Sequence, residues 1–134
     1  MKIRTLNDFD VKGKTVLLRV DMNVPIDPET KEITGSRRIE DVAITVKALD
    51  GAKIVIISHQ GRVGRDDFVG MENHAKELEK FCGKKVKYVC DVIGTYAQNE
   101  IKNMHDDEIL LLDNLRMCAE ENYEFTLEES AKTI

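Results

Sequence analysis

Short apolar runs alternate with longer amphipathic stretches along most of the chain. Runs of apolar, mainly β-branched or leucine residues have the length of strands, and they occupy residues 15–20, 54–57, 86–89 and 109–112. Three intervening stretches place apolar side chains three and four residues apart, as one helix face requires, at residues 36–49, 71–81 and 94–104. The pattern predicts strands separated by helices.

Strands that alternate with helices are typical of an α/β fold, because a helical crossover returns the chain to run parallel to the previous strand. We therefore expect a parallel sheet with helices on both faces, a three-layer Rossmann-like arrangement. A further helix is predicted from Thr126, because Glu128 and Glu129 suit a first helical turn. This helix has no terminator before Ile134, so we expect residues 1–134 to form an incomplete domain.

Polar and charged residues directly follow the predicted strands. They are Asp21 and Asn23 after the first strand, His59 and Arg62 after the second, and Asp113, Asn114 and Arg116 after the fourth; Arg37 and Arg38 open the first long helix. Ligands of doubly wound sheets bind at the carboxyl ends of the strands, so these side chains are expected around one crevice. Guanidinium groups suit phosphate or carboxylate, and an acid with an amide suits hydroxyls. The ligand suggested is a small phosphorylated hydroxy-acid.

Each candidate also has an ordinary structural interpretation. Arg62 could be a solvated surface side chain, and His59 could cap its turn through a local hydrogen bond. Asp21 and Asn23 could simply be turn residues before Pro25. A calcium loop over the spaced acids is disfavoured, because the glycine and the terminal glutamate of that motif are missing. His74, His105, Tyr88 and Tyr96 are interpreted as structural.

Composition narrows the class of partner. The 134 residues carry a formal charge of -5, which disfavours a nucleic-acid or membrane-surface protein, so any bound anion must be held by local arginines. No apolar run reaches the length of a membrane span, and the amino terminus lacks the apolar core of a signal peptide. Cys82, Cys90 and Cys118 fit no metal-ligand spacing, so reduced thiols in a cytosolic protein are expected.

The motifs RVDMNVP, SRRI, GAKIVIISHQGR and ILLLDNLR occur in this order along the chain. Together they resemble the amino-terminal domain of phosphoglycerate kinase, and the variants DMNVP and SHQGR are most similar to archaeal members. The resemblance covers essentially the whole chain but only the first portion of the 3-phosphoglycerate-binding half. It implies that the carboxyl-terminal nucleotide-binding domain is absent, so Mg-ATP or Mg-ADP would be a substrate of the full-length enzyme and this fragment would bind no cofactor and no metal.

The resemblance implies a role for each matching residue. Asp21 and Asn23 would hold the hydroxyl and carboxylate end of 3-phosphoglycerate, and Arg38 would lie nearest the reacting carboxyl as the catalytic residue. The phosphate of 3-phosphoglycerate or 1,3-bisphosphoglycerate would be held by His59, Arg62 and Arg116. The resemblance further implies a cytoplasmic, monomeric full-length enzyme of glycolysis. The fragment alone is expected to be inactive, and it could self-associate through the face that the missing part would cover.

Some positions depart from the family pattern, namely Ser36, Met22, Val63 and Asp113. The last three alter packing and loop stiffness more than charge, so the substrate site stays plausible. A non-catalytic α/β module that binds a phosphorylated metabolite remains the alternative. A phospho-acceptor domain is disfavoured, because its acceptor loop should follow the third strand, whereas Asp21 follows the first.

Overall fold

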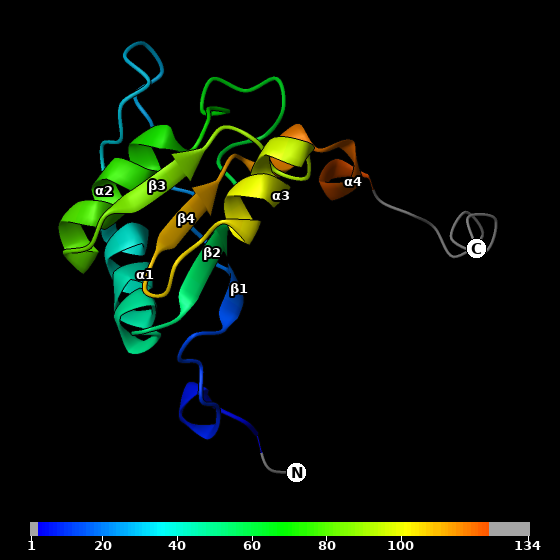
Figure 1. The fold of residues 1–134 in the computed structure, drawn as a ribbon. Helices are drawn as coiled ribbons and strands as arrows, with labels where there is room; N and C mark the ends of the chain where they lie inside the picture. The colour runs from blue at the N-terminus through cyan, green and yellow to red at the C-terminus, as the bar shows by residue number, and fades with distance from the viewer. Residues whose placement is uncertain (1–2, 124–134) are drawn as a thin grey trace.

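The computed structural model of the chain describes residues 3–123, which form one parallel sheet between two layers of helix (Figure 1). The strands are β1 (Thr15–Arg19), β2 (Lys53–Ile57), β3 (Val86–Val89) and β4 (Ile109–Leu112), and their order in the sheet is β1-β2-β4-β3. Every neighbouring pair is parallel. The predicted α/β fold with a parallel sheet is confirmed.

Helices cover both faces of the sheet. Helices α1 (Arg37–Ala48) and α2 (Glu72–Cys82) pack on one face, where they share a core with alternate residues of β2, β3 and β4. Helix α3 (Thr95–Lys102) packs on the opposite face against the other set of strand residues (Figure 1). Three short elements complete the described part: η1 (Leu6–Asp8), η2 (Leu115–Met117) and α4 (Ala119–Asn122). The helix predicted from Thr126 lies outside the described residues.

Burial follows the place of each strand in the sheet. All four residues of the central strand β4 are buried, whereas exposed and half-buried residues alternate along the edge strand β1. Leu17 of β1 remains 67% exposed, because the described core on the α3 side draws its residues from β2, β3, β4 and the region of α3. The outer face of β1 is therefore the least covered part of the described sheet.

Local chemistry sets where the helices begin and end. Gly83 ends α2 in the left-handed region at φ 70°, a conformation that costs glycine no strain, and its N–H donates to the carbonyl of Glu79. The carboxylate of Asp91 accepts hydrogen bonds from the N–H groups of Gly94 and Ala97 and thereby caps α3. Helix α3 is shorter than predicted, because Met104 is buried by a turn after the helix rather than by the helix itself.

Candidate functional site

The loops that follow β1 and β2 meet at the carboxyl edge of the sheet (Figure 1). Ser58, the first residue after β2, joins the loops on both sides. Its hydroxyl accepts the N–H of Met22 at 3.0 Å, and its carbonyl accepts the N–H of Leu115 at 3.0 Å. The prediction that the chain segments after β1, β2 and β4 lie at one edge is confirmed.

Arg38 reaches back from the first turn of α1 to the loop after β1. Its guanidinium donates to the carboxylate of Asp21 at 2.8 Å and to the carbonyl of Asn23 at 3.0 Å. Partial burial would raise the pKa of Asp21, but the N–H of Asn23 and the guanidinium of Arg38 together outweigh it, so the pKa is lowered. Asp21 is thus held ionised beside Arg38 on an accessible surface.

Asn23 and Arg116 both bind the backbone of Gly61. The side-chain oxygen of Asn23 accepts the N–H of Gly61 at 2.9 Å, and the guanidinium of Arg116 donates to the Gly61 carbonyl. Residues that follow three different strands are therefore joined through one glycine. Part of the hydrogen-bonding capacity of Asn23, which the sequence assigned to a substrate hydroxyl, already stabilises the loops.

His59 is half-buried among charged groups from the same edge. Burial and the neighbouring positive charge of Arg116 lower its pKa, while the carboxylates of Asp21 and Glu121 act in the opposite direction. A lowered pKa leaves His59 mainly neutral at neutral pH. Arg19 and Glu121, which form an ion pair beside this histidine, are charged neighbours that the sequence did not single out.

Arg62 is placed differently from the other predicted arginines. It follows Gly61 in an exposed turn, and its guanidinium has no hydrogen-bonding partner within residues 3–123. Arg37 instead pairs with Asp41 at 3.5 Å along its own helix, with 85% of its side chain exposed. Of the two, only Arg62 has a free guanidinium and also lies next to Gly61, where the loops after β1, β2 and β4 are joined.

Two hollows flank the guanidinium of Arg38. One of about 500 Å³ is lined by Asn23, Arg37 and other residues, and one of about 330 Å³ is lined by Asp21 and Thr45 among others. A three-carbon phosphorylated acid is small compared with either space. The predicted catalytic arginine therefore borders space that a ligand of this size could occupy.

A further charged hollow lies at the opposite, amino-terminal edge of the sheet. Its volume is about 400 Å³, and Lys84 and Asp107 contribute to its wall. Lys84 contacts the carboxylates of Asp50 at 2.5 Å and Asp107 at 2.6 Å, so its charge is neutralised locally. A neutralised lysine offers little attraction to an anion, which favours the carboxyl edge as the anion site.

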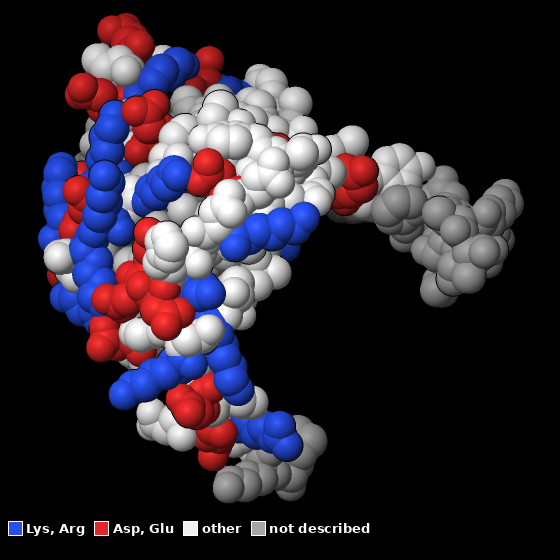
Figure 2. Space-filling model, in the orientation of Figure 1, with Lys and Arg blue, Asp and Glu red and all other residues white. Residues whose placement is uncertain are grey.

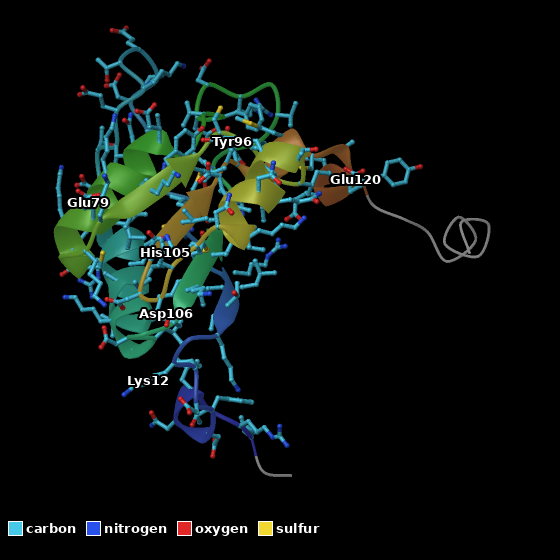
Figure 3. All side chains as sticks on the ribbon, in the orientation of Figure 1. Lys12, Glu79, Tyr96, His105, Asp106 and Glu120 are labelled. Atoms are coloured by element: carbon cyan, nitrogen blue, oxygen red, sulfur yellow. The ribbon has the colours of Figure 1, made fainter. Side chains whose placement is uncertain are left out.

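The residues interpreted from the sequence as structural do not line the two hollows beside Arg38. His74 is fully buried, and burial lowers its pKa to about 4. His105 precedes β4 and lies at the amino-terminal end of that strand, and Tyr96 lies on α3 (Figure 3). No group of three or more His, Cys, Asp or Glu side chains that could hold a metal ion occurs between residues 3 and 123. No helix in this part of the chain is long and apolar enough to cross a membrane.

Buried amides are the part of the site that sequence reasoning underestimated. Asn114 was noted only as a residue after β4, and Gln60 was given no role, yet both side chains are fully buried between the site loops. The signal that could have found Gln60 is its place inside the SHQGR motif, where a polar residue directly follows a buried strand. Asp113, which is 5% exposed, accepts the N–H of Met71 at 3.1 Å and is structural.

Comparison with known proteins identifies the family. The sequence model of the family described as phosphoglycerate kinase matches residues 6–133, nearly the whole chain. The chain belongs to the phosphoglycerate kinase family. A phosphoglycerate kinase from Methanosarcina mazei is 43% identical over 129 residues, which are 96% of this chain and 31% of the relative. One from Sulfurisphaera tokodaii is 41% identical over 135 residues, covering 99% of this chain and 32% of the relative.

Solved phosphoglycerate kinases share the fold. The crystal structure of phosphoglycerate kinase from Pyrococcus horikoshii matches with a TM-score of 0.84 and 36% identity, over 98% of this chain and 33% of that one. The enzyme from Coxiella burnetii matches with a TM-score of 0.64 and 25% identity, over 82% of this chain and 27% of that one. The chain thus spans about a third of the length of the phosphoglycerate kinases that it matches.

Proposed function

We propose that this chain is the 3-phosphoglycerate-binding portion of a phosphoglycerate kinase. The whole enzyme would transfer a phosphoryl group between 1,3-bisphosphoglycerate and ADP, or between ATP and 3-phosphoglycerate. The observation that carries the proposal is the set of contacts at the carboxyl edge, where Asp21, Asn23, Arg38 and Arg116 are joined directly or through Gly61. Family membership supports this reaction for the whole enzyme, and these contacts support its location.

The phosphate of the ligand would be held by His59, Arg62 and Arg116. A dianionic phosphate accepts hydrogen bonds best from groups that bring positive charge and are free to donate. Arg62 meets both conditions, and Arg116 retains donors beyond the one directed at the Gly61 carbonyl. His59 would gain a proton as the phosphate approached, because an adjacent negative charge raises the pKa of an imidazole.

The carboxyl and hydroxyl end of the ligand would lie beside Asp21, Asn23 and Arg38. In the free chain Arg38 is held by Asp21 at 2.8 Å, so its charge is already directed at the loop after β1. Phosphoryl transfer needs positioning and positive charge facing the transferring group more than covalent chemistry from the protein. Arg38 is therefore the residue that we assign to catalysis in the full-length enzyme.

Titration of the ¹⁵N-labelled chain with 3-phosphoglycerate tests this assignment. We expect saturable shifts of the amide signals of Asn23, Gly61 and Arg116. Smaller shifts are expected at the amino-terminal edge of the sheet, where Lys84 lies. Glycerate, which lacks the phosphate, should bind at least about tenfold more weakly, because it loses the charged hydrogen bonds of the phosphate. Saturable shifts confined to the amino-terminal edge, or none at all, would contradict the proposal.

The 134-residue chain by itself is expected not to catalyse the reaction. Phosphoryl transfer requires the nucleotide and its Mg²⁺ to be held in line with the acceptor. We assign no residue of this chain to nucleotide binding, and its sequence contains no GxxxxGK[ST] loop. A coupled assay of ADP phosphorylation from 1,3-bisphosphoglycerate should give only the background rate, and turnover that scales with the concentration of pure chain would refute the assignment.

A further inference from the structure

Gln60 lies between two groups of the proposed site, His59 and Gly61, but its own side chain is fully buried. The amide uses both of its ends on the backbone of a single residue of the loop after β1. Its Oε1 accepts the N–H of Val24 at 2.9 Å, and its Nε2 donates to the Val24 carbonyl at 3.0 Å. This paired contact resembles one rung of a sheet and fixes the loop after β1 to the end of β2.

His74 on α2 also contacts the Gln60 amide. Its Nε2 lies 3.0 Å from Oε1 of Gln60, and both side chains are fully buried. An amide oxygen only accepts hydrogen bonds, so Nε2 of His74 carries the proton. If the amide were reversed, its NH₂ group would face the N–H of Val24 and its oxygen would face the Val24 carbonyl, so the backbone of Val24 sets the orientation of the amide. The histidine adds a second hydrogen bond to Oε1 and so strengthens the hold on the orientation that Val24 sets.

Asn114 fixes the backbone of Gln60 from the other side. Its Nδ2 donates to the carbonyls of Gln60 at 2.7 Å and Val69 at 2.8 Å. Its Oδ1 accepts the N–H groups of Gln60 at 3.2 Å and Arg116 at 3.1 Å. The donors and acceptors of this buried amide are all in use, so Gln60 cannot shift without breaking contacts on three chain segments.

We propose that Gln60, paired with Val24 and hydrogen-bonded to His74, is a positioning residue that holds the loop around Asn23 and the turn at Gly61 and Arg62 in register for the ligand. This inference rests on the proposed function, because it assigns a role in the same anion site. The geometric reason for this role is that the N–H of Gly61 donates to the side-chain oxygen of Asn23 at 2.9 Å, and these two residues are the chain neighbours of Gln60 and Val24. Displacement of the Gln60 side chain would therefore move Asn23 relative to Arg62, although Gln60 itself touches no ligand.

The test compares Gln60→Met with Leu110→Ala in the ¹⁵N-labelled 134-residue chain. Methionine nearly matches the size and shape of glutamine but lacks the amide, so it leaves Val24 unpaired. Leu110 is buried in the cluster on the α3 side of the sheet, away from the core shared with α1 and α2, so Leu110→Ala controls for a general loss of stability. Unfolding by urea measures that loss in both variants.

Hydrogen exchange of the amides of Gly61 and Arg116 is the first measurement, and it needs no ligand. Neither N–H bonds to the Gln60 side chain, so faster exchange would report movement of the loops rather than loss of the deleted bond. We expect exchange to rise about tenfold in Gln60→Met and to change less than about twofold in Leu110→Ala. Equal rises in the two variants would overturn the inference.

Affinity for 3-phosphoglycerate is the second measurement. We expect the Kd to rise about tenfold or more in Gln60→Met and to stay within about twofold of the parent in Leu110→Ala. If the parent chain does not bind, the proposed function fails, and hydrogen exchange alone decides whether Gln60 holds the loops. If the parent binds and Gln60→Met binds equally well, the positioning role is wrong while the proposed function stands.

His74 provides the second pair of variants, in case Gln60→Met does not fold. His74→Leu removes the hydrogen bond to Oε1 and leaves every proposed ligand contact in place, so a smaller rise in Kd and in the exchange of Gly61 is expected. His74→Gln can place an N–H donor near the position of Nε2 and should restore both values toward the parent. If His74→Leu and His74→Gln behave alike, the hydrogen bond from His74 has no part in holding Gln60.

Discussion

At the scale of single residues, the proposed site arginines differ in what they already bind. Arg62 has a free guanidinium, whereas Arg38 is paired with Asp21 and must exchange that contact for the ligand. We therefore expect Arg62→Ala to weaken 3-phosphoglycerate binding by roughly 1.5–3 kcal/mol, the range for a hydrogen bond to a charged group. Arg38→Ala should cost less in ground-state affinity, because its main interaction develops only in the transition state. Calorimetric titration measures both.

Arg65→Ala is the matched control for Arg62→Ala. Both side chains are exposed in the same turn, where the N–H of Arg65 donates to the carbonyl of Arg62 at 2.9 Å through backbone alone. Removing the Arg65 guanidinium lowers the charge of the chain equally but should change the Kd less than about twofold. Equal losses from the two substitutions would indicate nonspecific attraction and would remove Arg62 from the site.

His59 should link ligand binding to proton uptake. Its pKa in the free chain is lowered from 6.5 by burial and by Arg116, and a bound phosphate would raise it again. Protonated His59 favours the complex, so affinity should increase as pH falls toward 6.5 and should weaken as pH rises through the pKa of the complex. Calorimetry at pH 7 in two buffers of different ionisation enthalpy should show net proton uptake. His59→Gln should abolish this uptake, and uptake unchanged in that variant would assign it to another group.

The residue types of the proposed site could be read from the sequence, but their partners could not. The positions after apolar runs indicated Asp21, His59 and Arg116, because a parallel sheet brings the ends of its strands to one edge. The contact between Arg116 and the Gly61 carbonyl depends on the adjacency of β2 and β4, which no local pattern encodes. For the same reason Gln60 gave no signal, since its importance lies in contacts made across the sheet.

At the scale of elements, the turn after β2 depends on a glycine at one position. Gly61 adopts φ 65°, and a Cβ there would lie 2.5 Å from the backbone carbonyl of Asp67. Gly64 adopts a similar φ of 80° but has no atom within 4 Å of its Cβ position. Gly61→Ala should therefore displace the turn and weaken 3-phosphoglycerate binding at least about tenfold, whereas Gly64→Ala carries only the conformational cost of about 1 kcal/mol in stability.

The paired glycine variants separate steric contact from backbone strain. Amide chemical shifts of Asn23 and Arg116, which bind the N–H and the carbonyl of Gly61, should change in Gly61→Ala and remain close to the parent in Gly64→Ala. Urea unfolding gives the stability of each variant, and titration gives the Kd. Should Gly61→Ala retain the parent Kd, the turn would not be a close-packed part of the anion site.

Element boundaries were predictable where one physical cause dominates. Strands β2, β3 and β4 match their apolar runs to within about one residue, and α2 ends at Gly83 as the glycine indicated. The short elements η2 and α4 were not predicted, because three or four residues carry no periodicity. The order β1-β2-β4-β3 was also beyond sequence reasoning, since periodicity identifies strands without choosing their neighbours.

At the scale of the whole molecule, a chain with net charge -5 is proposed to bind a polyanion. Lysines, arginines and acidic residues are interspersed over the face that carries α2, so the field there largely cancels at a distance (Figure 2). Attraction must then come from the few arginines within hydrogen-bonding reach, where charge interactions exceed those of distant groups. Self-association of the chain through an uncovered face stays a prediction, and among the described residues Leu17 on the outer face of β1 is 67% exposed.

Salt separates local attraction from the charge of the whole chain. Raising ionic strength screens both the arginines and the net negative charge, but the arginines contact the ligand, so their loss of attraction dominates. We expect the Kd for 3-phosphoglycerate to rise several-fold between about 0.05 and 0.5 M salt, since the Debye length falls from more than 10 Å to less than about 5 Å. The dependence of the Kd on salt concentration should be weaker in Arg62→Ala and unchanged in Arg65→Ala. A Kd that falls with salt would show instead that net repulsion governs binding and that no arginine cluster holds the phosphate.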